Sequence, residues 1–269
     1  MNGEQGVRKL IDFWKSGLER NPRCGVHPDD ATSIRALKQE HETGADRTPE
    51  QKLLDRQVLK GKLKDPGPDF DLTPVPYLGD LLSEKTDIFL LMLNPSLEPA
   101  DYYTHAKPEF REALIKNIKQ ECEPGASCLA LDKKFWWSSW FTYYEKLLRG
   151  AICKYATLEH DGRYLPALEA LACRLAIIEL VPYYSRESGW ITVSRARELP
   201  SSRMARDAAR DLQRRAKAGK ALLIMRWKRS KSLWGLNRSD GRITPVEGRG
   251  GFSDGNTAIF QWLRTHPAG

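Results

Sequence analysis

An amide and a carboxylate stand at or near the ends of two apolar runs of the chain. Residues 87–93 read DIFLLML and lead directly into Asn94 and Pro95, and Glu179 stands within the run LAIIELV at 175–181. An asparagine can hold and orient a water molecule as a weak acceptor. That is sufficient where a bond breaks largely by itself and a cation develops, as in hydrolysis of an N-glycosidic bond. The alternative is that Asn94 and Pro95 form an ordinary turn.

Apolar runs separated by helical patterns predict the sheet that would carry these residues. The runs cover 87–93, 175–181 and 221–227, and a short strand fits 241–246. Because these runs are apolar throughout, they indicate a parallel sheet with both faces covered. The predicted fold class is α/β, a three-layer α/β/α arrangement with a central, mostly parallel four-stranded sheet. Ligands bind beyond the carboxyl ends of such strands, where the amide and the carboxylate are expected. Helices are expected at 108–120, at 133–149, at 164–174, from Ser201 or Ser202 to Gly219, and from Asp254 onward.

The first 72 residues differ from the rest of the chain. They are polar, with apolar side chains at helical spacing in 7–18 and a second helix predicted in 48–63. Residues 64–76 carry four prolines and are typical of an extended connection. We therefore predict a helical extension over residues 1–72, packed on or beside a main domain that covers 73–269.

The positive charge of the chain is concentrated in one segment. The formal net charge is +8. Residues 195–231 hold 13 Lys and Arg against 3 Asp and Glu, so this segment is +10 and the remainder of the chain is −2. Such a block is typical of a face that binds a polyanion such as DNA. The alternative is a solvated basic helix.

Several classes of protein are disfavoured by what the sequence lacks. The five cysteines form no C-x-x-C pair and the five histidines are scattered, so we expect no disulfide framework, no metal and no cofactor. There is no glycine-rich nucleotide loop and no G-x-S-x-G motif. No window approaches twenty apolar residues and no signal peptide is recognisable, so we expect a cytoplasmic protein without a membrane span. A monomer is favoured.

Three segments together resemble the uracil-DNA glycosylase superfamily. PYLGDLLSEKTDIFLLMLNPSLEPADYY (76–103) is similar to its first motif, which places Gly-x-Asn-Pro-Gly or Gly-Gln-Asp-Pro after the first strand. LAIIELVPYYS (175–185) resembles the second strand, which ends in a base-reading Asn. RGGFSDGNTAIFQWL (249–263) is similar to the segment that follows the His-Pro-Ser motif. The resemblance covers about 75–265, and a phage-defence member that acts on modified bases is the nearest type.

The resemblance implies a role for individual residues. Asn94 would position the hydrolytic water, and Tyr102 or Tyr103 would stack on the everted base. The alternative for the two rings is packing in the core or on the surface. The other candidates would contact DNA: Ser185, Arg226, Lys228, Arg229 and Lys231 at backbone phosphates, and Arg249 to Phe252 as a loop wedged into the duplex.

The chain also departs from the superfamily's pattern. Ser96 replaces a glycine, and His-Pro-Ser is missing, so the leaving base must be stabilised by another group such as Arg249 or Arg242. Glu179 stands where the superfamily keeps its base-reading Asn. A carboxylate only accepts hydrogen bonds, so it would repel O4 of uracil and accept from the N4 amino group of cytosine. Two alternatives stay open: Glu179 pairs with an arginine and reads nothing, or it is protonated and donates to uracil.

These features predict a monofunctional DNA glycosylase that acts on a bulky modified cytosine of phage DNA, such as a glucosylated hydroxymethylcytosine, in preference to uracil. It would bind double- or single-stranded DNA through the basic segment. No lysine stands at the first motif to form a Schiff base, so strand cleavage by the protein itself is not expected. The alternatives are a uracil-DNA glycosylase of base-excision repair and an inactive DNA-binding module of the same fold. A metal-dependent nuclease is disfavoured because acidic residues do not cluster at the strand ends.

Overall fold

The structure is a computed structural model of the protein, and it describes residues 5–22, 25–40, 68–123, 126–185, 193–226, 231–236, 243–246 and 252–267. The helices are α1 (Gln5–Arg20), α2 (Ala31–Glu40), α4 (Pro99–Ala106), α5 (Pro108–Lys119), α6 (Ser139–Glu159), α7 (Tyr164–Ala172), α8 (Val193–Glu198), α9 (Pro200–Lys217), α10 (Lys231–Trp234) and α11 (Ser253–Thr265). The strands are β1 (Pro68–Asp69), β2 (Tyr77–Leu78), β3 (Ile88–Met92), β4 (Leu175–Glu179), β5 (Tyr184–Ser185), β6 (Leu222–Arg226) and β7 (Ile243–Val246). The helix predicted in 48–63 lies outside the described residues.

Four parallel strands form the centre of the larger sheet, in the order β4-β3-β6-β7. Every residue of β3 and β4 is buried, which explains why their sequences are apolar throughout. The short strand β2 extends this sheet by pairing antiparallel with β4 at the edge, and it was not predicted. The prediction of an α/β protein with a mostly parallel sheet is confirmed.

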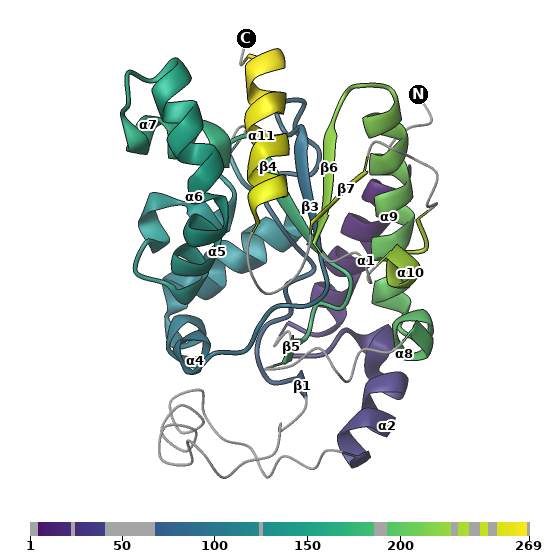
Figure 1. Ribbon diagram of the computed structural model, residues 1–269. Helices are drawn as coiled ribbons and strands as arrows, with labels where there is room; N and C mark the ends of the chain where they lie inside the picture. Colours follow the sequence, from purple (N-terminus) through teal and green to yellow (C-terminus); the bar gives the residue numbers. More distant parts are fainter. Residues whose placement is uncertain are drawn as a thin grey trace.

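Helices lie on both sides of this sheet (Figure 1). α1 and α9 pack against each other on one side, and α6 packs against α11 on the other. Both α9 and α11 contact β6, which places the sheet between the two groups of helices. The likeness to the uracil-DNA glycosylase fold in particular stays a prediction.

The start of α9 differs from the prediction. Leu199 occupies the N-cap position and Pro200 is the first helical residue. The side chains of Ser201 and Ser202 are buried within the first turn. The prediction that one of these serines caps the helix is therefore wrong, because the proline already sets the backbone geometry at the helix start.

The helix predicted in 7–18 is α1, and its apolar face belongs to the core of the protein. Asp211 of α9 accepts hydrogen bonds from the backbone N–H groups of Gly6 and Val7. These groups lie in the first turn of α1, where no partner exists within the helix and a negative charge is favourable. The amino-terminal helix is thus packed against α9, one of the helices that cover the sheet. The predicted domain boundary after residue 72 stays a prediction.

A second link joins the amino-terminal region to the carboxyl end of the sheet. The Tyr183 hydroxyl donates to Asp30 Oδ2 at 2.7 Å, and the Ser201 N–H donates to Asp30 Oδ1 at 3.0 Å. Tyr183 immediately precedes β5, and Ser201 lies in the first turn of α9. Asp30 therefore holds the beginning of α9 beside β5.

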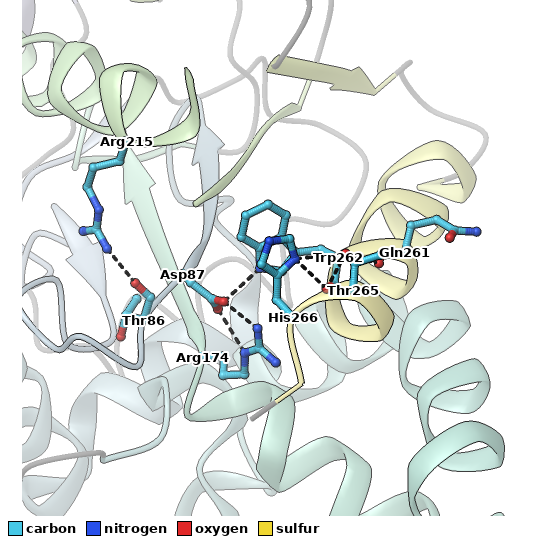
Figure 2. A network of polar contacts seen from close by, with 8 residues as sticks. All are labelled: Thr86, Asp87, Arg174, Arg215, Gln261, Trp262, Thr265 and His266. Carbon is cyan, nitrogen blue, oxygen red and sulfur yellow. Dashed lines mark hydrogen bonds and ion pairs between the residues drawn. The ribbon is translucent and has the colours of Figure 1, made fainter. Parts of the chain in front are cut away.

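A polar network ties both helical layers to the amino ends of β3 and β4 (Figure 2). Asp87 accepts from Arg174 Nε at 3.0 Å and from Trp262 Nε1 of α11 at 2.8 Å. On the other side, Arg215 of α9 donates to the Thr86 carbonyl at 3.1 Å. The network lies at the edge opposite the carboxyl ends of the strands, so its role is to hold the layers together.

Replacing Arg174 with alanine is expected to destabilise the protein by roughly 3 kcal/mol, because it leaves the half-buried Asp87 without its ion partner. Arg163→Ala serves as the control, since Arg163 pairs with Asp161 at an exposed site and should cost less than about 1 kcal/mol. Urea unfolding of the three proteins measures both values. Equal losses in the two variants would contradict a structural role for the network.

Candidate functional site

A cavity of about 320 Å³ opens at the carboxyl ends of β3, β4 and β6. β4 follows β3 in the chain and lies on one side of it in the sheet, whereas β6 lies on the other side. In open parallel sheets, ligands bind where the strand order reverses in this way. The cavity is lined by four predicted residues, Asn94, Glu179, Ser185 and Arg226. It is also lined by residues of α4 and α6 that were not predicted, among them Asp101, Trp140, Tyr143 and Tyr144.

The amide of Asn94 is held in one orientation. Its Nδ2 donates to the Ser185 hydroxyl at 2.8 Å and to the Pro95 carbonyl at 3.0 Å. Because a carbonyl can only accept, the Pro95 contact identifies the nitrogen of the amide. No described residue donates a hydrogen bond to Asn94 Oδ1. Oδ1 is therefore the acceptor that Asn94 has available for a ligand or a water molecule.

Ser185 lines the cavity with only 1% of its surface exposed. Its hydroxyl accepts from Asn94, and its backbone bridges to Ser96 and accepts from Leu97 N–H. Ser185 therefore helps to hold Asn94, and its predicted contact with DNA stays a prediction.

Glu179 is the last residue of β4 and is part of the cavity wall, and only 2% of its surface is exposed. Tyr144 donates to its Oε1 at 3.4 Å, and Oε2 is buried without a hydrogen bond. Burial raises the pKa of Glu179 to about 8, although the Tyr144 hydrogen bond lowers it in part. The carboxyl is therefore neutral at pH 7, whereas the preference for cytosine assumed a carboxylate. Among the described residues no arginine pairs with Glu179.

Arg226 brings a positive charge to the cavity at the end of β6. Its guanidinium lies over the Tyr143 ring, 5.2 Å from the ring centroid. Burial lowers the pKa of Arg226, but a guanidinium stays charged at neutral pH. Arg226 is thus placed to attract a negative charge that develops inside the cavity.

Asp101 adds a second carboxyl to the wall, from the first turn of α4. It accepts from the Glu98 N–H at 2.6 Å and from the Ser139 hydroxyl at 2.7 Å. Burial raises the pKa of Asp101 to about 6, while these hydrogen bonds oppose the increase. Asp101 is therefore mostly ionised at pH 7 and able to accept a proton.

Comparisons with known proteins gave no match. No protein-family model, no curated protein and no solved structure matches this chain. The resemblance to the uracil-DNA glycosylase superfamily stays a prediction from the sequence.

Three predicted aromatic residues do not line the cavity. Tyr102 is fully buried and its hydroxyl donates to Asp69, whereas Tyr103 is 49% exposed and packs edge-on against Trp137. Neither ring is among the lining residues, so the structure does not bring them to the site. Phe252, which was predicted as part of the wedge loop, is buried at the start of α11.

The remaining predicted contacts to DNA fall on parts of the chain that are not described. Lys228, Arg229, Arg242 and Arg249 lie outside the described residues, and Lys231 is described only by its place at the start of α10.

The predicted basic face includes the outer surfaces of α8 and α9. Arg197, Arg203 and Arg210 are exposed and lie near Arg206, whose pKa is lowered by burial and by these neighbouring charges. Asp207 neutralises part of this charge by pairing with Arg210. Because Asp30 holds the start of α9 beside β5, the basic surface begins at the same end of the molecule as the cavity.

The rings that do line the cavity come from the first turns of α6. Ser138 caps this helix by accepting from the Phe141 N–H at 3.2 Å. Trp140, Tyr143 and Tyr144 then recur at helical spacing and face the ends of the strands. The spacing was visible in the sequence, but only the packing of α6 against the sheet assigns these rings to the cavity.

Within the described ranges, no helix has the length and apolarity needed to cross a membrane. The same residues contain no group of three His, Cys, Asp or Glu side chains arranged to hold a metal ion.

Proposed function

We propose that the protein is a monofunctional DNA glycosylase that everts a non-canonical pyrimidine into the cavity and hydrolyses its N-glycosidic bond, leaving an abasic site. The observation that carries this proposal is the orientation of Asn94, which engages its amide nitrogen and leaves Oδ1 at the cavity. An acceptor of this kind suits a reaction whose transition state is a sugar cation. Aromatic rings around it suit an everted base.

The residues of the cavity divide the reaction between them. Asn94 Oδ1 holds the water whose oxygen bonds to C1′ of the sugar, while the C–N bond breaks and its electron pair leaves with the base. Arg226 lies where its charge attracts the departing anion, a role that the missing His-Pro-Ser motif leaves open. Asp101 is the candidate acceptor for the proton that the water loses, since it lines the same cavity and is mostly ionised at pH 7.

The base itself is proposed to be a modified cytosine, such as a glucosylated hydroxymethylcytosine of phage DNA, with uracil as the alternative. The cavity of about 320 Å³ leaves room for a substituted ring. The neutral Glu179 does not by itself favour cytosine, since a carboxylic acid both donates and accepts.

The test is release of free base from DNA. Duplex and single-stranded oligonucleotides containing uracil, hydroxymethylcytosine or glucosylated hydroxymethylcytosine are incubated with the full chain, and the released base is identified by mass spectrometry. We expect one of these bases together with an alkali-labile abasic site. The proposal fails if no substrate yields free base.

A DNA-binding module without catalysis is the second candidate, and the arginines of α8 and α9 favour it. It predicts binding that weakens with salt and no abasic product. The alkali-labile product separates the two functions, because only hydrolysis forms it.

Ser185→Ala is expected to slow base release by roughly 10-fold, the loss that corresponds to about 1.4 kcal/mol, since Asn94 then lacks one of the two bonds that orient its amide. We expect the single-turnover rate to fall and the dissociation constant for DNA to stay within about threefold of the wild-type value, because the buried hydroxyl is engaged with Asn94. A loss of binding instead of rate would support the prediction that Ser185 contacts DNA.

A further inference from the structure

One atom in the cavity wall has no partner although it is buried and polar. Glu179 Oε2 makes no hydrogen bond with any described residue. Buried polar atoms are satisfied in most proteins, so an orphan atom on a residue that lines a cavity indicates that a ligand supplies the missing partner. Glu179 lines the cavity together with Asn94, so that ligand would occupy the space beside the proposed catalytic amide.

Tyr144 distinguishes the two oxygens of this carboxyl. Its hydroxyl is a donor, and it contacts Oε1 at 3.4 Å. In a neutral carboxylic acid the carbonyl oxygen is the better acceptor, so the contact favours Oε1 as the carbonyl and Oε2 as the hydroxyl. Burial raises the pKa of Tyr144 well above its usual range, so its hydroxyl remains a donor throughout the working pH range.

We propose that Tyr144 and Glu179 form a directional reader of the base edge, in which Oε2 of a neutral Glu179 donates to an acceptor atom of the ring and Oε1 accepts from a donor beside it. This inference rests on the proposed function, because the ligand is taken to be an everted base. It adds a specificity-determining residue, Tyr144, that contacts Glu179 and not the scissile bond.

The direction matters because the two pyrimidine types present opposite edges. Cytosine-type rings have an acceptor at N3 and a donor at the N4 amino group, and uracil has a donor at N3 and an acceptor at O4. A carboxylic acid whose proton can sit on either oxygen pairs with both rings. A carboxylic acid whose direction is held by Tyr144 pairs well with one of them.

The other groups around the carboxyl leave this arrangement intact. Tyr184 of β5 and Asp101 of α4 interact electrostatically with each other, and Tyr184 also with Glu179. Burial keeps the Tyr184 phenol neutral by raising its pKa. Arg226 from β6 and Glu98 ahead of α4 complete the charged lining of the cavity. Tyr144 is the residue among the described ones that donates to Glu179.

Binding to uncleavable DNA tests the reader without depending on hydrolysis. Two duplexes carry one 2′-fluorinated nucleotide, whose glycosidic bond resists cleavage, with either 5-hydroxymethylcytosine or uracil as its base. Fluorescence anisotropy gives the dissociation constants at pH 7 for the wild type, Tyr144→Phe and Glu179→Gln. Circular dichroism checks that each variant is folded. If Glu179→Gln does not fold, the comparison of Tyr144→Phe with the wild type still tests the proposal.

We expect the wild type to prefer one base by about 10-fold or more, the effect of one correctly matched contact. Tyr144→Phe should reduce this preference by at least about fivefold, because the proton of Glu179 is then free to change oxygen. Glu179→Gln should keep the preference, since its Oε1 accepts from Tyr144 and its Nε2 donates as Oε2 does. Affinity for the hydroxymethylcytosine duplex should fall between pH 7 and pH 9 in the wild type and not in Glu179→Gln, if that is the preferred base.

Two results would overturn the reader: no base preference in the wild type, or an unchanged preference in Tyr144→Phe. If either result is found but DNA still yields free base, the glycosylase proposal stands and only the reader is rejected. If the three proteins bind as expected but no DNA yields free base, the reader is supported and hydrolysis is rejected. Absence of binding to both duplexes overturns both proposals.

Discussion

Asn94→Ala is expected to slow base release by about 1,000-fold while DNA binding changes by less than about threefold. A placed group that acts on the transition state contributes on the order of 10²–10⁴ in rate. Asn94 meets the geometric condition for such a group, because Ser185 and Pro95 hold its nitrogen and its Oδ1 has no described donor. Alanine removes the acceptor without filling the cavity. Single-turnover kinetics on the best substrate measures the rate directly.

Asn21→Ala is a matched control for this variant. Asn21 also donates from Nδ2 to a backbone carbonyl, that of Val26 at 3.1 Å, but it lies in the turn after α1 and does not line the site cavity. We expect its rate to stay within about twofold of the wild type. Wild-type base release by Asn94→Ala would reject the assignment of Asn94 and with it the proposed mechanism.

The elements of the sheet could be predicted because burial on both faces leaves a direct mark in the sequence. β3 and β4 are apolar at nearly every position, and Asn94 and Glu179 interrupt that pattern where the strands end. Those two residues do line one cavity, as the rule for parallel sheets implies. β2 and β5 could not be predicted, since a strand of two residues has no periodicity.

The aromatic side chains of the site could not be assigned from sequence, because their environment depends on contacts far along the chain. Tyr102 is turned into the core by Asp69, which lies 33 residues earlier. Tyr143 and Tyr144 belong to a helix, whereas the sequence pointed to the residues just after the strands. The protonation of Glu179 is likewise a property of enclosure, and composition contains no sign of it.

The stability of Glu179→Gln relative to the wild type is expected to increase as the pH rises from 4.5 to 8, whether or not the protein is an enzyme. The ordinary pKa of a glutamate is 4.5, and burial raises that of Glu179 to about 8. Between these values the folded state keeps a proton that the unfolded state loses, so wild-type stability falls as the pH rises. The loss is about 1.4 kcal/mol for each pH unit, on the order of 4 kcal/mol in total. Glutamine does not titrate, so the variant avoids this loss.

Urea unfolding at pH 4.5, 6.5 and 8 measures the difference in stability between Glu179→Gln and the wild type. That difference should grow from pH 4.5 to pH 8 and then level off, because above pH 8 both states of the wild type are ionised. Other buried acids such as Asp101 titrate in both proteins and cancel. Glu145→Gln on the same helix as Tyr144 should show the opposite sign, since the Arg149 guanidinium lowers the pKa of Glu145 and its contribution is lost as the pH falls. A difference that is constant with pH would show that Glu179 is ionised in the folded protein, and the carboxylate would then select cytosine by accepting from its N4 amino group.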